Sequence, residues 1–174
     1  MTGLQMRDAR PNDRDAIEAV TLSAYQEYAA LMPARWEGYR QNILATLADV
    51  QPAAQIVADQ ESHIVGTVLL YPAETVIANP GSVPVTLTWP AVRLLAVAPT
   101  ARGQGVGAAL MQECVRRARQ SGARVLTLHT ADIMQAAMRL YARMGFQRAP
   151  DLDFQPAPGV TIKGYRLSLE ETVS

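Results

Sequence analysis

Three glycines, Gly103, Gly105 and Gly107, alternate behind Arg102 where an apolar strand pattern gives way to a helix pattern. At the start of a helix several backbone N–H groups have no intrahelical partner, and the helix dipole places positive charge there. Glycine lets the main chain approach a ligand closely, because it carries no side chain. Such a segment is suited to bind phosphate or pyrophosphate. The sequence therefore predicts that the chain holds a phosphorylated cofactor by its backbone.

The composition is that of an ordinary globular protein. The chain has 174 residues, of which 49% are apolar and 18% charged, and sixteen basic residues balance sixteen acidic ones. With a net charge of zero, the chain has no overall electrostatic attraction to nucleic acid or to an anionic membrane. The single Cys114 excludes an internal disulfide and a multi-cysteine metal site, and no apolar run has the length of a membrane span or a signal peptide. We therefore expect one cytoplasmic domain over residues 1–174, with no membrane or nucleic-acid partner.

The hydrophobic pattern predicts alternating helices and strands. Strands are expected at residues 4–10, 55–59, 63–71, 92–97, 125–130, 146–148 and 160–169, with a short one at 83–87 inside a proline-rich excursion over 72–90. Helices are expected at 17–28, 36–47 and 104–119, and a fourth follows Asp132, which can cap it. The unit over 92–130 should be a right-handed crossover between parallel strands. The order predicts an α/β fold whose first half is mostly antiparallel.

Two motifs resemble those of the GNAT superfamily of N-acetyltransferases. Residues 102–107 (RGQGVG) resemble the family's acetyl-CoA loop, Arg/Gln-x-x-Gly-x-Gly/Ala, and residues 140–146 (LYARMGF) resemble its Leu-Tyr-x-x-x-Gly-Phe. The opening residues 6–13 (MRDARPND) also resemble the family's first strand and turn. The resemblance covers essentially the whole chain. It implies the α/β (α+β) acyl-CoA N-acyltransferase fold, with a mixed central sheet of about six to seven strands flanked by about four helices.

The resemblance assigns the cofactor contacts mainly to the backbone. Acetyl-CoA would be the cofactor and CoA the product, and the loop would point N–H groups at the pyrophosphate. Main-chain groups of Leu95 and Val97 would pair with the pantetheine arm like an added strand, and the Val97 N–H would polarise the thioester carbonyl. The cofactor-binding residues implied in this way are Leu95, Ala96, Val97, Arg102, Gly103, Gln104, Gly105, Val106, Gly107 and Ala108.

The same resemblance gives Tyr141 the role of general acid, which protonates the departing CoA thiolate. A phenol with a pKa of about 10 stays protonated at neutral pH and can donate to a sulfur anion with a pKa of about 8–9.

Two positions depart from the family pattern. Many relatives carry an asparagine seven residues before this tyrosine, where the chain has Met134, so a polar contact to the cofactor arm is missing or supplied elsewhere. Many also carry a glutamate that acts as a general base near the start of the central strand, where the chain has about Ala91. The base is therefore left open among Glu74, His129 and Asp132, and an amine that enters neutral needs no strong base.

The resemblance implies that the acceptor is an amine, of a small molecule or a peptide, and the sequence leaves its identity open. In this fold the first two helices wall the acceptor pocket, so Tyr28, Trp36 and Tyr39 are candidate contacts, although their helical spacing also suits core packing. Glu74 and His129 complete the candidate set. The resemblance implies direct attack of the amine on the thioester, with no metal and no covalent enzyme intermediate, and it leaves a homodimer open.

Several alternatives stay open at this point. A non-catalytic acyl-CoA-binding sensor, or a transferase for a different acyl group, would use the same scaffold. The glycine loop could also be a tight turn that binds nothing. Residues 103–108 fit the dinucleotide pattern Gly-x-Gly-x-x-Gly/Ala. Residues 99–102, however, separate the strand from the first glycine, whereas the dinucleotide fold turns directly from its strand.

Overall fold

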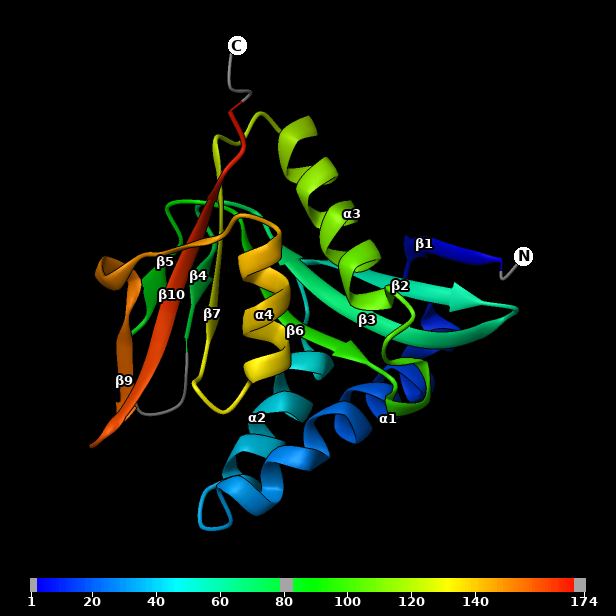
Figure 1. Ribbon diagram of the computed structural model, residues 1–174, viewed down its shortest axis with the longest axis horizontal. Helices are drawn as coiled ribbons and strands as arrows, with labels where there is room; N and C mark the ends of the chain where they lie inside the picture. The colour runs from blue at the N-terminus through cyan, green and yellow to red at the C-terminus, as the bar shows by residue number, and fades with distance from the viewer. Residues whose placement is uncertain (1–2, 79–82, 171–174) are drawn as a thin grey trace. The chain divides into compact units, whose positions relative to one another are not determined.

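The structure is a computed structural model that describes residues 3–78 and 83–170. Figure 1 shows its helices and strands. The chain forms two units, and each is assembled from two stretches: Met1–Leu70 with Leu94–Glu113, and Tyr71–Arg93 with Cys114–Ser174. The expectation of one domain over residues 1–174 stays a prediction.

The first unit contains an antiparallel sheet of three strands. It is formed by β1 (Leu4–Asp8), β2 (Ala54–Gln60) and β3 (His63–Tyr71), paired in that order. A two-residue turn joins β2 to β3, and its residues Glu61 and Ser62 have φ of 52° and 67°. Tight hairpins use positive φ at both central residues because this geometry matches the twist of the flanking strands. Most of β3 is buried, as its nearly unbroken apolar sequence predicts.

The helices of the first unit follow β1. They are η1 (Pro11–Asp13), α1 (Arg14–Tyr25), η2 (Gln26–Leu31) and α2 (Trp36–Ala48), of which η1 and η2 are 3-10 helices. The carboxylate of Asp13 accepts a hydrogen bond from the N–H of Arg10 at 2.7 Å and ion-pairs with Arg7 at 2.7 Å. This arrangement fixes the entry of the chain into α1. The helix predicted over residues 17–28 ends as an α-helix at Tyr25 and continues in the tighter 3-10 form.

Three elements lead to and from the glycine loop. They are β6 (Ala91–Val97), the 3-10 helix η3 (Pro99–Ala101) and α3 (Val106–Gln120). In the first unit, a Cβ added to Gly66 of β3 would lie 2.9 Å from the side chains of Val106 and Leu110. Glycine at this position therefore lets β3 and the first turns of α3 approach closely. The close packing sets where α3 begins and so where the loop lies within this unit.

The second unit contains the remaining strands and the last helix. They are β4 (Val76–Ile77), β5 (Val85–Thr86), β7 (Val125–Thr130), α4 (Gln135–Arg143), β8 (Gln147–Arg148), η4 (Pro150–Leu152), β9 (Phe154–Ala157) and β10 (Val160–Ser168). The first residues of β6 run parallel to β7, with Ala91 opposite Thr127 and Val92 opposite Leu128. β10 runs antiparallel to β7, β8 and β9, and β4 pairs with β5 in a separate hairpin.

The hydrogen-bonded strand order is β1-β2-β3-β6-β7-β10-β8, with β9 beside β10. Antiparallel pairs dominate, and the β6–β7 pair is parallel, as the crossover over residues 92–130 predicts. Within the described residues four α-helices accompany this sheet. The predicted mixed α/β fold is therefore confirmed.

Several predicted boundaries are wrong, for physical reasons. The helix expected from residue 104 begins at Val106, because Gly103 and Gly105 adopt left-handed φ of 75° and 80°, which a helix does not accept. Asp132 does not cap the last helix. Met134 holds the N-cap position of α4, and the Asp132 carboxylate ion-pairs with Lys163 at 2.6 Å.

The excursion over residues 72–90 contains two very short strands where one was expected. β5 covers only part of the predicted strand at 83–87, and β4 was not predicted. β9 was also missed. Strands of two to four residues are too short to show a periodicity. Residues 79–82 of this excursion lie outside the described residues.

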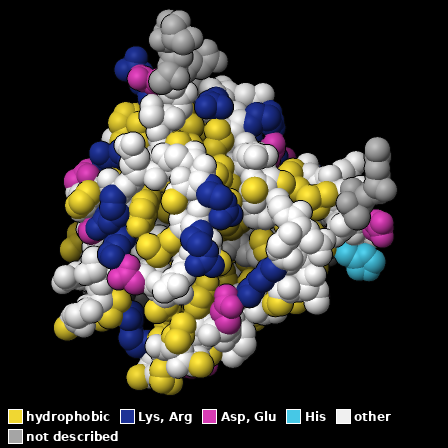
Figure 2. Space-filling model, viewed as in Figure 1, with side chains coloured by type: hydrophobic (Ala, Val, Ile, Leu, Met, Phe, Trp, Pro, Cys, Tyr) yellow, Lys and Arg dark blue, Asp and Glu magenta, His cyan; other side chains and the backbone are white. Residues whose placement is uncertain are grey.

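Charged side chains are dispersed over the face of the molecule that Figure 2 shows. Lys and Arg side chains stand in small groups among apolar and uncharged ones, and acidic side chains lie beside several of them. Among the described residues, no helix is both long and apolar enough to cross a membrane.

Candidate active site

In the glycine loop at the start of α3 (residues 102–107), no atoms lie close to the positions where Gly103 and Gly105 would carry a side chain. Gly103 and Gly105 have positive φ, and a Cβ added to either would meet nothing within 4 Å. Glycine is therefore required here by the backbone conformation and not by packing. The N–H of Ala109 donates to the carbonyl of Gly105 at 3.0 Å, so the N–H groups of residues 106–108 precede the first hydrogen bond of the helix. This geometry fits a diphosphate held by main-chain donors.

The side chain of Arg102 is engaged by α1 and η2. Its guanidinium donates to the Glu27 carboxylate at 3.0 Å and to the carbonyl of Ala24 at 3.1 Å. The second bond satisfies one of the last carbonyls of α1, where cations are favoured. Arg102 thus ties the loop to the end of α1, which leaves the backbone of the loop as the candidate for binding an anion.

Within β6, Leu94 has φ of 52°, which lies in the left-handed region. A non-glycine residue pays about 1–2 kcal/mol for that conformation. The register of β6 with β7 ends at Val92, just before this residue. Beyond it, the N–H of Ala98 donates to the carbonyl of Val65 at 2.8 Å. Leu94 thus immediately precedes Leu95, Ala96 and Val97, whose main-chain groups the sequence predicts to lie along the pantetheine arm.

An aromatic cluster lies in the same unit. Tyr25 packs against Tyr28 with ring centroids 5.8 Å apart and against Tyr39 at 6.0 Å, and Trp36 lies 6.2 Å from Tyr39. The hydroxyl of Tyr25 donates to the carbonyl of Leu95 at 3.0 Å. Burial raises the pKa of the Tyr28 hydroxyl, and the Glu27 carboxylate raises it further. The structure thus brings together the three aromatic candidates that the sequence proposed for the acceptor.

Tyr25 makes a contact that the sequence analysis did not predict. Its ring is buried. Its hydroxyl, however, reaches the main chain of β6 beside the predicted cofactor residues. A buried tyrosine needs a partner for its hydroxyl, and this requirement was the available signal.

In the second unit, residues 140–146, which contain Tyr141, form the C-terminal end of α4 and the turn that follows it. Tyr141 is buried, its ring centroid lies 5.8 Å from that of Phe146, and the Phe146 N–H donates to the Tyr141 carbonyl at 3.0 Å. Gly145 takes φ of 94°, the left-handed conformation that commonly ends a helix. The Tyr-x-x-x-Gly-Phe spacing therefore fixes the phenol by packing and by the helix end.

His129 on β7 is oriented by η4. Its Nε2 lies 2.8 Å from the carbonyl of Leu152, and its ring meets Phe154 edge-on at 5.3 Å. Because a carbonyl only accepts, Nε2 carries the hydrogen and the lone pair of the neutral ring is at Nδ1. Burial lowers the pKa of His129, and the nearby Arg93 cation lowers it further. The hydrogen bond to Leu152 and the Asp153 carboxylate raise this pKa, but the net shift is downward and favours the neutral ring.

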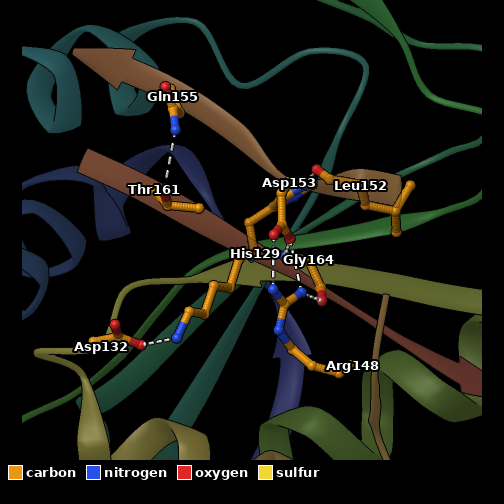
Figure 3. A network of polar contacts seen from close by, with 9 residues as sticks. His129, Asp132, Arg148, Leu152, Asp153, Gln155, Thr161 and Gly164 are labelled. Carbon is orange, nitrogen blue, oxygen red and sulfur yellow. Dashed lines mark hydrogen bonds and ion pairs between the residues drawn. The ribbon is translucent and has the colours of Figure 1, made fainter. Parts of the chain in front are cut away.

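Figure 3 shows that His129 is one part of a larger polar network. Arg148 donates two hydrogen bonds of 2.7 Å to Asp153, whose carboxylate also accepts from the Gly164 N–H at 2.8 Å. These bonds hold the pKa of Asp153 at about 2. A Cβ on Gly164 would overlap with Leu152, so β10 must present glycine here. The network fastens the segment after η4 to β10.

The remaining candidates for a general base have other surroundings. Asp132 is ion-paired with Lys163 at 2.6 Å. Glu74 is exposed in a turn at φ of 65°, and its N–H donates to the carbonyl of Leu87 at 2.7 Å. Ala91 is buried at the first position of β6, so it offers no carboxylate there.

A sequence model of the acetyltransferase (GNAT) family matches residues 21–146. The chain therefore belongs to the GNAT family, and it is an acetyl-CoA-dependent N-acetyltransferase. This result confirms the predicted family, the enzyme class and the cofactor. The dinucleotide alternative is wrong, since η3 stands between β6 and the first glycine.

Solved structures of similar fold cover nearly the whole chain. A GNAT-family acetyltransferase from Desulfovibrio desulfuricans is 20% identical with a TM-score of 0.68, over 97% of this chain and 100% of that one. A GNAT-family acetyltransferase from Brucella melitensis, in complex with acetyl-CoA, is 20% identical with a TM-score of 0.63, over 100% and 93%. An acetyltransferase from Salmonella typhimurium, with its cofactor acetyl-CoA, is 16% identical with a TM-score of 0.61, over 99% and 98%. No curated protein matches the chain.

Proposed function

We propose that this enzyme transfers the acetyl group to a primary amine by direct attack, with the acetyl-CoA and the amine bound together. The observation that supports the proposal most is the left-handed glycine loop, which is followed by N–H groups that precede the first hydrogen bond of α3. The structures from Brucella melitensis and Salmonella typhimurium that contain acetyl-CoA have the same fold.

The residues of the proposed site bind the cofactor, orient its thioester and supply a proton. The backbone of residues 103–108 holds the diphosphate, and main-chain groups of Leu95 and Val97 align the pantetheine arm. When bound, acetyl-CoA supplies a thioester that a neutral amine can attack. The Val97 N–H donates to the thioester oxygen where negative charge develops, a contact worth about 3–4 kcal/mol in well-studied enzymes. The Tyr141 phenol holds the proton that the leaving sulfur takes.

The acceptor wall is proposed to consist of Tyr28, Trp36 and Tyr39. All three residues are half-buried. Aromatic faces attract both apolar groups and cations, which suits an amine with an apolar or charged body. A small-molecule or peptide amine remains compatible with this wall. His129 is the preferred base among the candidates, because its ring is neutral and oriented while Asp132 is neutralised by Lys163.

The decisive experiment measures free thiol released from acetyl-CoA in the presence of a panel of amines. The panel should include amino acids, polyamines, arylalkylamines and peptides with a free N-terminus. We expect thiol release above the hydrolysis background with at least one amine, and mass spectrometry should find that amine heavier by one acetyl group. The same panel with propionyl-CoA and succinyl-CoA tests the acyl group. Binding of acetyl-CoA without amine-dependent thiol release in any panel would contradict the proposal.

A further inference from the structure

The strand β6 contains one charged residue, Arg93, in an otherwise apolar sequence (AVRLLAV), and this residue belongs to the second unit. Strands inside a sheet are usually apolar throughout, and an arginine that is partly removed from water is usually paired. Arg93 is half-buried, yet its guanidinium has no hydrogen bond or ion pair with another residue that the structure describes. Two other cations of this unit are paired, Arg148 with Asp153 and Lys163 with Asp132. An anion that the chain itself does not supply would therefore complete the surroundings of Arg93.

The guanidinium of Arg93 is open to solvent. Within residues 3–78 and 83–170, the Oγ1 of Thr130 is the buried side-chain nitrogen or oxygen atom that lacks a hydrogen-bond partner. The nitrogens of Arg93 also lack a partner in this part of the chain, but they are not buried in this way, so solvent and a ligand can reach them. The Arg93 Cζ lies over the ring of Tyr71, 5.6 Å from its centroid. This contact holds the cation in place while its N–H groups stay available.

Arg93 and the proposed base His129 lie on neighbouring strands of the second unit. The parallel register of β6 with β7 pairs Val92 with Leu128, and the next residues of the two strands are Arg93 and His129. Because successive side chains alternate between the faces of a sheet, Arg93 and His129 share one face. The Arg93 charge lowers the pKa of His129, in agreement with this placement. Neighbouring strands lie about 4.8 Å apart, so one small molecule can contact both side chains.

The chemistry of these two side chains indicates the ligand. A guanidinium offers parallel N–H donors that match the two oxygens of a carboxylate, and such bidentate pairs are among the strong hydrogen bonds of proteins. One unpaired positive charge is balanced by one negative charge, which a carboxylate carries at neutral pH. The His129 ring, whose neutral form is favoured, can take a proton from an amine of the same molecule. A ligand that satisfies both residues has an amine and a carboxylate close together.

We propose that Arg93 binds a carboxylate of the acceptor, so that the substrates of this enzyme are small amines that also carry a carboxylate, as amino acids do. This inference rests on the proposed function, since it needs an amine acceptor and uses His129 as the base. It makes Arg93 a specificity-determining residue, which binds the acceptor and takes no part in the chemical step. The guanidinium is unpaired in the free enzyme and becomes paired when the acceptor is bound.

The test compares amines that differ only in the carboxylate. Amino acids with apolar, aromatic and charged side chains are assayed by thiol release from acetyl-CoA, each next to its carboxamide. For the best amino acid, the wild-type kcat/KM should exceed that of its amide by at least about tenfold, the worth of a hydrogen bond to a charged group. O-phosphoethanolamine is included as a phosphate-bearing amine, and a preference for it over every amino acid would overturn the assignment of a carboxylate.

Variants of Arg93 show whether this residue causes the preference. Arg93→Gln removes the charge, so its kcat/KM for the amino acid should fall about 10–100-fold, mainly through KM. Its kcat/KM for the amide should stay within about threefold of the wild type, which also shows that the variant folds. Arg93→Lys keeps the charge without the forked donors and should lie between the two. Arg166→Gln is the matched control, because it removes an arginine that is already ion-paired with Asp151, and it should change neither reaction.

Two results would overturn the inference and leave the proposed function intact. One is an equal loss with the amino acid and the amide in Arg93→Gln, which would assign Arg93 a structural role. The other is a wild type that acetylates amides as well as the matching amino acids. If Arg93→Gln does not fold, the wild-type ratio and Arg93→Lys decide the question. A wild type that releases no thiol with any amine would contradict the proposed function itself, so the two failures are distinguishable.

Discussion

The guanidinium of Arg102 lies 3.0 Å from the carboxylate of Glu27, so the first residue of the acetyl-CoA loop is paired with the segment that follows α1. The same side chain donates to the Ala24 carbonyl, and one residue further along Tyr25 bonds to the carbonyl of Leu95. Within this unit, the end of α1 is therefore attached at two points to elements assigned to the cofactor. The aromatic wall and the cofactor backbone are supported by the same few residues.

This pairing predicts that Arg102 contributes little to phosphate binding. Arg102→Gln should change the dissociation constant of acetyl-CoA by less than about threefold, because we propose that the loop backbone holds the diphosphate. The ion pair is half-exposed, so its loss should cost at most about 1 kcal/mol of stability. Calorimetry at two salt concentrations checks this. An affinity loss above tenfold, together with a weaker dependence on salt, would place the guanidinium on a phosphate.

A second prediction concerns the loop conformation. Gly105→Ala forces a side chain into a left-handed conformation at φ of 80°, which costs about 1–2 kcal/mol. We expect that loss in the free energy of unfolding, and at least a tenfold weaker binding of acetyl-CoA as the backbone shifts. Gly38→Ala is the matched control, since Gly38 lies within α2 with nothing near its added Cβ.

The control should behave in the opposite way. Alanine is favoured over glycine inside a helix by about 1 kcal/mol, so Gly38→Ala should stabilise the protein and leave the cofactor affinity unchanged. Urea unfolding and calorimetry on both variants give the comparison. If Gly105→Ala bound acetyl-CoA as tightly as the wild type, the loop backbone would not be the phosphate site.

The sequence predicted the loop and the fold well because both depend on local patterns. Alternating glycines before an apolar helix face and unbroken apolar runs in central strands are visible without any tertiary information. The contacts of Arg102 and Tyr25 were not visible, since each joins residues about 70 or more positions apart. The left-handed Leu94 was equally hidden, because leucine carries no local preference for that conformation.

The third prediction tests the proposed acid. Tyr141→Phe keeps the packing against Phe146 and removes the proton donor. The kcat should fall by about 10²-fold or more, the usual contribution of general acid catalysis, while the acetyl-CoA dissociation constant changes little. Tyr165→Phe, at a tyrosine that packs against Arg148, should leave kcat unchanged. A Tyr141→Phe variant with wild-type kcat would remove this phenol from the mechanism.

The fourth prediction concerns stability and pH. Burial lowers the pKa of His129 in the folded state, so between that value and the ordinary value of about 6.5 the unfolded chain binds more protons. The free energy of unfolding should therefore fall as the pH drops below about 6.5. His129→Gln, which keeps a donor for the Leu152 carbonyl, should show a smaller loss between pH 7.5 and 5.

His63 is the natural control, because it is the other of the two histidines in the chain and is exposed. His63→Gln should retain the wild-type decline of stability over this pH range. Urea unfolding at several pH values measures the slopes. Identical slopes for wild type and His129→Gln would show that this ring does not govern the acid sensitivity.

The dependence of the glycine loop on backbone groups also has a consequence for how far the sequences of such enzymes can diverge. If backbone amides bind the nucleotide, almost every neighbouring side chain can be replaced without loss of binding. The condition is that the loop keeps the same backbone torsion angles. Structures only 16–20% identical to this chain keep its architecture. Selection on cofactor use would then act on a handful of glycines, and the surfaces that meet the amine would be free to specialise.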